Sequence, residues 1–354
     1  MDICIATDNN YVPIMSVLIL SILDNTNKPQ NLTLHIFEYG MSDNNKNLLQ
    51  EMSNKYNASI KFYSVDDYID NIKKKINNAW ANNNSYVTYA RLYMSDLLDE
   101  NIKQFIYLDC DTLVLGDLEK LYSYNMQDKV IAGVKDVLPN TYKTWMGFKN
   151  GEYYNAGALL INAKEWRKRN LTNKFYDYCN EHSNDIFPDQ DALNILLKNQ
   201  IVTLNPQYCV FYPEYSWTGD AQLKGYCGDE ISFYKKNELE YAGKHPIIIH
   251  FTDSVIGRPW QSNNINPYSK CWMKYYNMLP KEMLFEFKPK YIGWKTKIYR
   301  MLYKILPQLF FVKFTIKEEI AILIRRWKEK TYDCRSKWFW KYWFWCCYGL
   351  FKRI

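Results

Sequence analysis

Short apolar segments alternate with helical segments through most of the chain. Strands separated by helices are typical of βαβ units, in which helices cover both faces of a largely parallel sheet. Residues 12–23 are apolar nearly all round, which indicates a helix buried in the core. The pattern therefore predicts an α/β fold. Strands are predicted at 3–7, 32–38, 59–65, 105–109, 130–134 and 156–162, and helices at 12–23, 42–56, 86–98 and 189–198.

The composition narrows the class of protein and its compartment. With 354 residues, of which 47% are apolar and 23% charged, the chain can form one large folded domain or two ordinary ones. Its nine cysteines include no CxxC pair, which argues against a zinc ribbon or a disulfide scaffold and favours a reducing cytoplasm. We see no signal peptide and no apolar run of the roughly 20 residues that span a bilayer. We therefore expect a cytoplasmic protein.

An apolar run ends in two carboxylates that stand two positions apart. In FIYLDCDTLVLGDL, which begins at Phe105, Asp109 and Asp111 follow four apolar residues. Unpaired charges are costly to bury, and alternate residues of a strand share a face, so both carboxylates could hold one cation, with Cys110 facing the other side. The end of a strand is where α/β folds bind ligands, and divalent metals there bridge diphosphate oxygens. A solvated turn is the alternative interpretation.

Two enzyme classes use such an aspartate pair. In aspartyl-phosphate phosphatases the first aspartate, here Asp109, is the nucleophile. Their D-x-D-x-Thr/Val motif lies near the start of the chain, whereas this pair lies far along it and Leu113 stands where the Thr or Val would be. In nucleotide-sugar transferases the pair holds the metal of a nucleoside diphosphate sugar. A non-catalytic UDP-sugar- or glycan-binding protein is a third hypothesis, and a sugar nucleotidyltransferase would need a glycine-rich loop that we do not see.

Six motifs, in order along the chain, resemble glycosyltransferase family 8. This family of retaining enzymes includes bacterial lipopolysaccharide α-galactosyl- and α-glucosyltransferases and glycogenin. The resemblance spans residues 1–265 and implies a GT-A fold, a Rossmann-like mixed sheet covered by helices, in a catalytic domain of residues 1–270. The motifs are ATDNNYV (6–12), YVTYARLYM (86–94), YLDCDTLVLGDL (107–118), YNAGALLINAKEWR (154–167), DQDALN (189–194) and IIHFTDSVIGRPW (248–260).

The resemblance implies a metal site and a donor site for UDP-hexose. Asp109, Asp111 and His250 would hold Mn²⁺, with Mg²⁺ as the alternative, because imidazole favours softer metals. Tyr11 would stack on the uracil, and Arg258 stands where the family usually has a Lys that contacts the diphosphate. The residues expected to contact the donor or its metal are Ala6, Asp8, Asn10, Tyr11, Arg91, Asp109, Cys110, Asp111, Asn155, Asp189, Gln190, Gly257 and Arg258.

The resemblance also implies how the sugar is transferred. A galactose or glucose would pass to a sugar hydroxyl near Asp136 with retention of configuration. Retention by double displacement needs a nucleophile, and the resemblance places Gln190, whose amide is a poor one, on the required face. We therefore expect a front-face route in which the departing phosphate accepts the proton of the acceptor. Asp191, and after it Asp189, are the alternative nucleophiles.

The C-terminal region differs in charge from the rest of the chain. From Lys288 onward it holds 17 Lys and Arg, 4 Asp and Glu, and 18 aromatic residues among 67, and residues 316–330 place apolar side chains on one helical face. Trp and Tyr prefer the bilayer interface, and basic amphipathic helices lie in that plane. We expect residues 271–354 to form a helical tail that binds the anionic inner face of the cell membrane, which suits an oligosaccharide or glycolipid acceptor. A buried helical subdomain is the alternative, and we expect no nucleic-acid partner.

Overall fold

The computed structural model describes residues 1–75, 86–136, 143–144, 146–148, 152–182, 188–210, 234–252 and 256–305. The chain divides into two compact units, Met1–Phe310 and Phe311–Ile354. All described residues belong to the first unit. The apolar helical face predicted at 316–330, and with it most of the predicted tail, lies outside the described residues.

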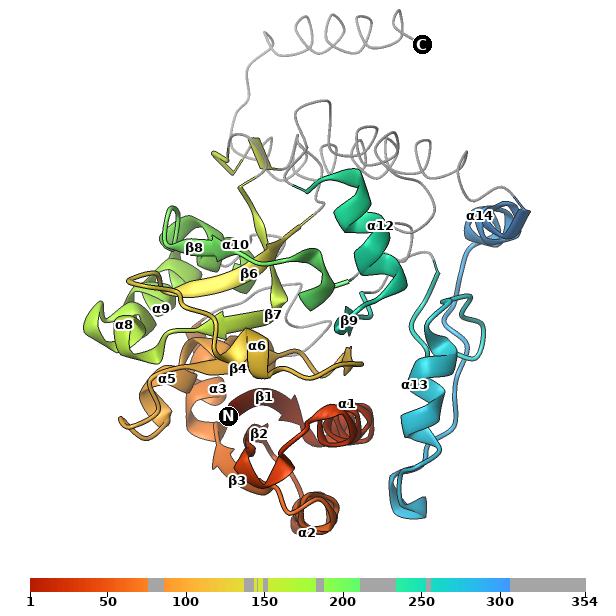
Figure 1. Cartoon of the computed structure of the whole chain (residues 1–354), viewed down its shortest axis with the longest axis horizontal. Coiled ribbons are helices and arrows are strands. Elements are labelled where there is room, and N and C mark those ends of the chain that lie inside the picture. Colours follow the sequence, from red (N-terminus) through yellow and green to blue (C-terminus); the bar gives the residue numbers. More distant parts are fainter. Residues whose placement is uncertain are drawn as a thin grey trace, which may run out of the picture. The chain divides into compact units, whose positions relative to one another are not determined.

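The N-terminal half follows the predicted alternation of strands and helices (Figure 1). Ser42 begins the second helix as expected, because its hydroxyl accepts a hydrogen bond from the amide of Asn45. The predicted helix at 86–98 is a 3-10 helix followed by a short α-helix. The elements are β1 (Asp2–Asp8), η1 (Asn9–Tyr11), α1 (Val12–Asn25), η2 (Pro29–Asn31), β2 (Thr33–Tyr39), α2 (Asp43–Lys55), β3 (Ser59–Ser64), α3 (Asp66–Lys75), η3 (Tyr86–Leu92), α5 (Met94–Leu97), β4 (Phe105–Leu108), β5 (Thr112–Val114) and α6 (Glu119–Tyr122).

The C-terminal half adds three further strands of the main sheet and one strand beside it. Here too the predicted strands at 130–134 and 156–162 and the helix at 189–198 are confirmed within two residues. The elements are β6 (Ile131–Lys135), β7 (Tyr154–Ile161), α8 (Ala163–Lys168), α9 (Leu171–Glu181), α10 (Pro188–Leu196), β8 (Ile201–Thr203), η4 (Pro206–Tyr208), α12 (Lys236–Lys244), β9 (Ile248–His250), α13 (Ser269–Tyr276), η6 (Lys281–Met283) and α14 (Trp294–Ile305).

Seven strands form one mixed sheet in the order β3-β2-β1-β4-β7-β6-β8. Strands β1 to β4 are parallel, so the prediction from the βαβ pattern holds for this part of the sheet. Strand β7 runs antiparallel to both β4 and β6, which makes the sheet mixed. Strands β5 and β9 form a separate antiparallel pair. The carboxyl ends of β1 and β4 therefore lie at one edge of the sheet, where the two chain segments that follow them can meet.

Two large hydrophobic clusters form most of the described core, and alternate residues of strand β1 belong to different clusters. Ile3 and Ile5 of β1 pack in the cluster that contains α1, whereas Cys4 and Ala6 pack in the cluster of α3, α8, α9 and α10. Residues 14–23 of α1 are all buried, as the apolar sequence predicted. Burial of apolar surface on both faces holds the strand ends in fixed positions.

The segment after residue 270 contributes to the core of the first unit. Trp272 and Tyr275 of α13 belong to the cluster of α1, and Phe285 and Phe287 pack against it. Arg300 of α14 is buried and donates a hydrogen bond to the carbonyl of Asn263. Within the described part of the chain, no helix has the length and apolar character needed to cross a membrane. The membrane association of residues 271–354 stays a prediction.

Candidate active site

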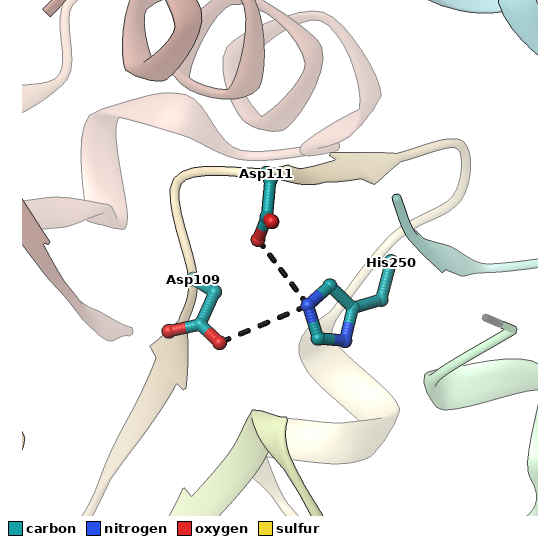
Figure 2. Close-up of side chains that lie close together, drawn as sticks. All are labelled: Asp109, Asp111 and His250. Atoms are coloured by element: carbon teal, nitrogen blue, oxygen red, sulfur yellow. Dashed lines mark ion pairs between the residues drawn. The ribbon is translucent and has the colours of Figure 1, made fainter. Parts of the chain in front are cut away.

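The aspartate pair lies in a turn at the carboxyl edge of the sheet. The amide of Asp109 still donates to Gly157 O of β7 at 2.9 Å, which continues the pairing of β4. The chain then turns, because the amide and the hydroxyl of Thr112 both donate to Asp109 O at 3.0 and 2.7 Å. Asp109 and Asp111 therefore lie in a turn between β4 and β5. The interpretation from the sequence, in which they stand at alternate positions of one strand, is wrong. The turn nevertheless brings both carboxylates toward one point (Figure 2).

A histidine from a strand remote in the sequence completes the cluster. Antiparallel pairing of β5 with β9 sets Thr112 opposite His250. The Nε2 atom of His250 lies 3.2 Å from Asp111 Oδ1 and 3.8 Å from Asp109 Oδ2 (Figure 2). One ligand atom from each of the three residues lies within 4.8 Å of the others. Two carboxylates and an imidazole suit a divalent ion such as Mn²⁺, so these residues fit the metal that we expected.

An arginine holds the outer oxygen of each carboxylate. Arg91 Nη2 donates to Asp109 Oδ1 at 2.9 Å, and Tyr107 OH donates to the same oxygen. Arg258 Nη2 donates to Asp111 Oδ2 at 2.7 Å. Charge-assisted bonds of this kind offset the cost of burying the carboxylates. The remaining oxygens, Asp109 Oδ2 and Asp111 Oδ1, are the ones that face His250.

The charges in this cluster shift one another's protonation equilibria. Burial raises the pKa of Asp109, although Arg91 opposes the effect. Burial acts in the same direction on Asp111, but His250 and Arg258 outweigh it and lower the pKa of Asp111 to about 2. Burial would lower the pKa of His250, yet Asp111 raises it well above its ordinary value. The carboxylates thus favour positive charge at the point where the three side chains meet.

Asn155 fixes the orientation of the His250 ring. Its Oδ1 accepts a hydrogen bond from the amide of Gly157 at 2.8 Å, and its Nδ2 donates to Asp136 Oδ2 at 3.0 Å, so both ends of the amide are assigned by their partners. The same Oδ1 lies 3.1 Å from His250 Nδ1, which must therefore be the donor. This arrangement directs Nε2, the other ring nitrogen, toward the carboxylates.

Three of the residues expected around the transferred sugar form one network next to His250. Gln190 Oε1 accepts from the amide of Ala156 at 3.0 Å, and its Nε2 donates to Asp136 Oδ2 at 3.2 Å and to Tyr153 OH at 3.3 Å. Burial raises the pKa of Asp136, although its bond from Asn155 opposes the effect. The structure thus brings together three of the predicted residues, Asp136, Asn155 and Gln190.

The two alternative nucleophiles are both held by strong partners. Asp189 Oδ2 accepts from Thr88 Oγ1 at 2.8 Å and lies 3.2 Å from Arg91 Nε. Asp191 is fully buried, and its Oδ1 accepts from Tyr153 OH at 2.6 Å. Arg91 therefore links Asp109, beside His250, to Asp189 at the start of α10.

The residues expected to bind the nucleotide lie at the end of β1. Asp8 Oδ1 accepts from the amides of Asn10 and Tyr11, both at 3.0 Å, and so shapes the turn that follows the strand. The Tyr11 ring packs edge-on against Trp260, with centroids 6.3 Å apart. Cys110 Sγ donates to Ala6 O at 3.0 Å, which joins this turn to the aspartate turn.

Several residues of the site, Tyr153 among them, were not singled out from the sequence. Thr88 binds Asp189, Tyr107 binds Asp109, and Gly157 lies directly against the His250 ring. Of these, the sequence holds a signal only for Gly157, because a glycine inside a strand often marks a place where another group comes close to the backbone. Gly257 has a φ of 79°, which favours glycine.

The chain is similar to known proteins both in sequence and in fold. Residues 2–264 match the family model described as Glycosyl transferase family 8. The chain is 29% identical over 283 residues to general stress protein A of Bacillus subtilis, covering 78% of this chain and 92% of that protein. It is 28% identical over 284 residues to a lipopolysaccharide 1,2-glucosyltransferase of Escherichia coli, covering 77% of each.

Among solved structures, the galactosyltransferase LgtC in complex with donor and acceptor sugar analogues has a similar fold. The TM-score is 0.67 at 22% identity, and the match covers 80% of this chain and 98% of LgtC. The mixed α/β arrangement is therefore that of LgtC, a GT-A fold, as the resemblance implied. The similar fold alone does not show the family, but the family model matches most of the length of the chain. The chain therefore belongs to glycosyl transferase family 8.

Proposed function

We propose that this protein is a retaining, metal-dependent hexosyltransferase that moves galactose or glucose from a UDP-hexose to a sugar hydroxyl. The observation that carries the proposal is the convergence of Asp109, Asp111 and His250, whose ligand atoms lie within 4.8 Å of one another at the carboxyl edge of the sheet. Membership of a glycosyltransferase family favours this function over a phosphatase that would use Asp109 as its nucleophile.

The donor would lie between the metal cluster and the turn after β1. Asp109, Asp111 and His250 would hold Mn²⁺ or Mg²⁺, and such an ion would neutralise the negative charge of a departing UDP. Arg258 contacts Asp111, and its guanidinium is a suitable partner for diphosphate oxygens because it can bind them bidentately. Gly257, which precedes it in the chain, would contact the diphosphate through its backbone. Ala6, Asp8, Asn10 and Tyr11 would contact the uridine, and Cys110 would line the same end of the site.

The sugar would lie over the network of Asp136, Asn155 and Gln190, with Arg91 and Asp189 beside it. Both ends of the Gln190 amide already have partners, and an amide is a weak nucleophile in any case. Asp189 and Asp191 are each held by a short hydrogen bond. This supports a front-face route, in which the chain holds donor and acceptor in place and the departing phosphate takes the acceptor proton.

The acceptor would be an oligosaccharide or glycolipid at the inner face of the cell membrane. The strong excess of Lys and Arg after Lys288 supports binding to an anionic surface. Tyr291 and Trp294, which are 93% and 68% exposed, could enter the bilayer interface. One relative is named as a lipopolysaccharide glucosyltransferase, which is consistent with an acceptor of this kind.

Hydrolysis of the donor by the purified protein tests the proposal. The named relatives include a galactosyltransferase and a glucosyltransferase, so UDP-galactose and UDP-glucose should be compared with Mn²⁺, with Mg²⁺ and with EDTA. We expect UDP release from one of the two donors, only with a divalent metal. Tight binding of UDP and Mn²⁺ without turnover of either donor would instead indicate a non-catalytic binding protein.

A further inference from the structure

The imidazole of His250 lies directly on the backbone of strand β7 at Gly157. A Cβ atom placed on Gly157 would come closer than 3.0 Å to the Cε1, Nδ1 and Nε2 atoms of the ring, an approach that real side chains essentially never show. Gly157 is buried in the middle of β7, where every other residue carries a side chain. Its amide donates to Asn155 Oδ1, and its carbonyl accepts from the amide of Asp109.

The ring is held in its position by the backbone of β9 and by its polar partners. Its own backbone is fixed, because the amide of His250 donates to Val210 O at 3.0 Å and β9 pairs with β5 on its other side. Cys209, which is fully buried, has its Sγ 3.5 Å from the same Asn155 oxygen that holds His250 Nδ1. The two carboxylates lie in front of Nε2.

We propose that Gly157 is a positioning residue for the metal cluster. The missing Cβ lets the His250 ring lie against β7 while Asn155 holds Nδ1, and this position directs Nε2 to the point that Asp109 and Asp111 share. A side chain at 157 displaces the ring, breaks its bond to Asn155 and withdraws the nitrogen ligand. The inference rests on the proposed metal site.

The first experiment measures the affinity for Mn²⁺ alone, by the loss of the free-ion signal in electron paramagnetic resonance. Gly157→Ala should weaken binding by about tenfold or more, the range typical of residues that orient a metal ligand. Gly133→Ala in the neighbouring strand β6 is the matched control. Its Cβ would also lie within 3.0 Å of an atom, but that atom is Leu159 Cδ2, the end of a flexible side chain. The control should keep the affinity of the wild type within about twofold.

The second experiment uses thermal unfolding in EDTA, which needs neither metal nor donor. Gly157→Ala should lower the midpoint by about 2 °C or more in the wild-type background. In a His250→Ala background the same change should lower it much less, because the ring that Cβ would meet is gone. If the Gly157→Ala protein does not fold but the protein with both Gly157→Ala and His250→Ala does, the conclusion is the same: the Cβ atom at 157 conflicts with the His250 ring.

These results separate the inference from the proposed function. A Gly157→Ala protein that binds Mn²⁺ like the wild type overturns the inference, as does an equal loss of stability with and without the His250 ring. In either case donor hydrolysis by the wild type could still support the proposed function. A wild type that binds Mn²⁺ but hydrolyses neither donor would contradict the proposed function, while the two variant comparisons would still test the role of Gly157.

Discussion

At the scale of single residues, the two oxygens of each site carboxylate have different partners. Arg91 holds Oδ1 of Asp109, and Arg258 holds Oδ2 of Asp111, while the other two oxygens face His250. An arginine that occupies one oxygen also limits how the carboxylate can turn. The outer contacts therefore select which oxygen of each carboxylate faces His250, which the chemistry of an aspartate alone does not specify.

Asp111→Asn should abolish metal-dependent hydrolysis of the donor. The change removes a negative charge and little volume, and Asp111, with a pKa of about 2, is ionised throughout the neutral range. Assays of UDP release across a Mn²⁺ titration would measure the effect, with the exposed Asp177→Asn in α9 as the control. The wild type should lose activity in EDTA and regain it with Mn²⁺. Full activity of the wild type in EDTA would contradict the assignment of the cluster as a metal site.

Tyr11→Ala should weaken the binding of UDP by about 1–3 kcal/mol, the range for an aromatic ring stacked on a base. The loss should appear in the KM for the donor more than in kcat, because the uracil is remote from the reacting bond. Tyr11→Phe keeps the ring and its contact with Trp260, so it should bind UDP nearly as the wild type does. An unchanged KM in Tyr11→Ala would mean that the ring only packs against Trp260.

At the scale of elements, the pair of strands that carries His250 depends on helix α1. Ser21 Oγ of α1 accepts a hydrogen bond from the buried amide of Val114 in β5, at 3.0 Å. Asn25 Nδ2 donates to the carbonyl of the same residue at 3.2 Å. Since β5 pairs with β9, these bonds from α1 also fix the strand on which His250 lies.

Ser21→Ala should lower the free energy of unfolding by about 1–3 kcal/mol, because it leaves the Val114 amide buried without a partner. Ser16→Ala is the matched control in the same helix. Its hydroxyl is equally buried but donates only to the carbonyl of Val12, one turn earlier. Urea unfolding of both variants would measure the difference. Equal losses in the two variants would show that the bond to β5 contributes nothing of its own.

Asp2 should make stability depend on pH at the start of the sheet. Burial alone would raise the pKa of Asp2, but its contacts with His35 in β2 and Tyr122 in α6 outweigh burial and lower it. A carboxyl whose pKa is lower in the folded state stabilises above its unfolded pKa of about 3.9 and loses that effect as the pH falls through the folded value. Asp2→Asn should therefore be less stable than the wild type at pH 7, and the difference should shrink below about pH 4. A constant difference in urea unfolding across this range would contradict the assignment.

At the scale of the whole molecule, the first compact unit extends well beyond the predicted boundary of the catalytic domain at residue 270. Phe287 packs against Trp272 and Phe285 against Tyr276, and Arg300 lies beside the turn that contains Gly257. The segment that follows α13 therefore supports the loop expected to contact the diphosphate.

A chain that ends after residue 310 should hydrolyse the donor but sediment less with anionic vesicles than the full chain does, because most of the basic residues after Lys288 are removed. A chain that ends after Met283 should lose hydrolysis as well, because Phe285, Phe287 and Arg300 are removed from the catalytic unit. Sedimentation with anionic and with neutral lipid vesicles, beside the hydrolysis assay, would measure both effects. If the chain ending at 310 and the full chain sediment equally with anionic vesicles, the region beyond 310 is not the membrane anchor.

The sequence by itself determined the features that depend on local pattern. Alternation of apolar runs predicted the strands β1 to β4 and the buried helix α1, and the carboxylates after FIYL predicted a ligand site at the end of β4. The order of the six motifs predicted the family, and the family model confirms it. These features were readable because the periods of strands and helices, and the spacing of motifs, are properties of neighbouring residues.

Only the tertiary structure decided how remote residues combine. The antiparallel direction of β7, the pairing of β5 with β9 and the contact of His250 with Gly157 join segments that are far apart in the sequence. The tertiary structure likewise decides that Arg91 binds Asp109 and that Arg258 binds Asp111. Local periodicity says which face of a strand is apolar but not which strand lies beside it, because strand order and register follow from packing the whole core.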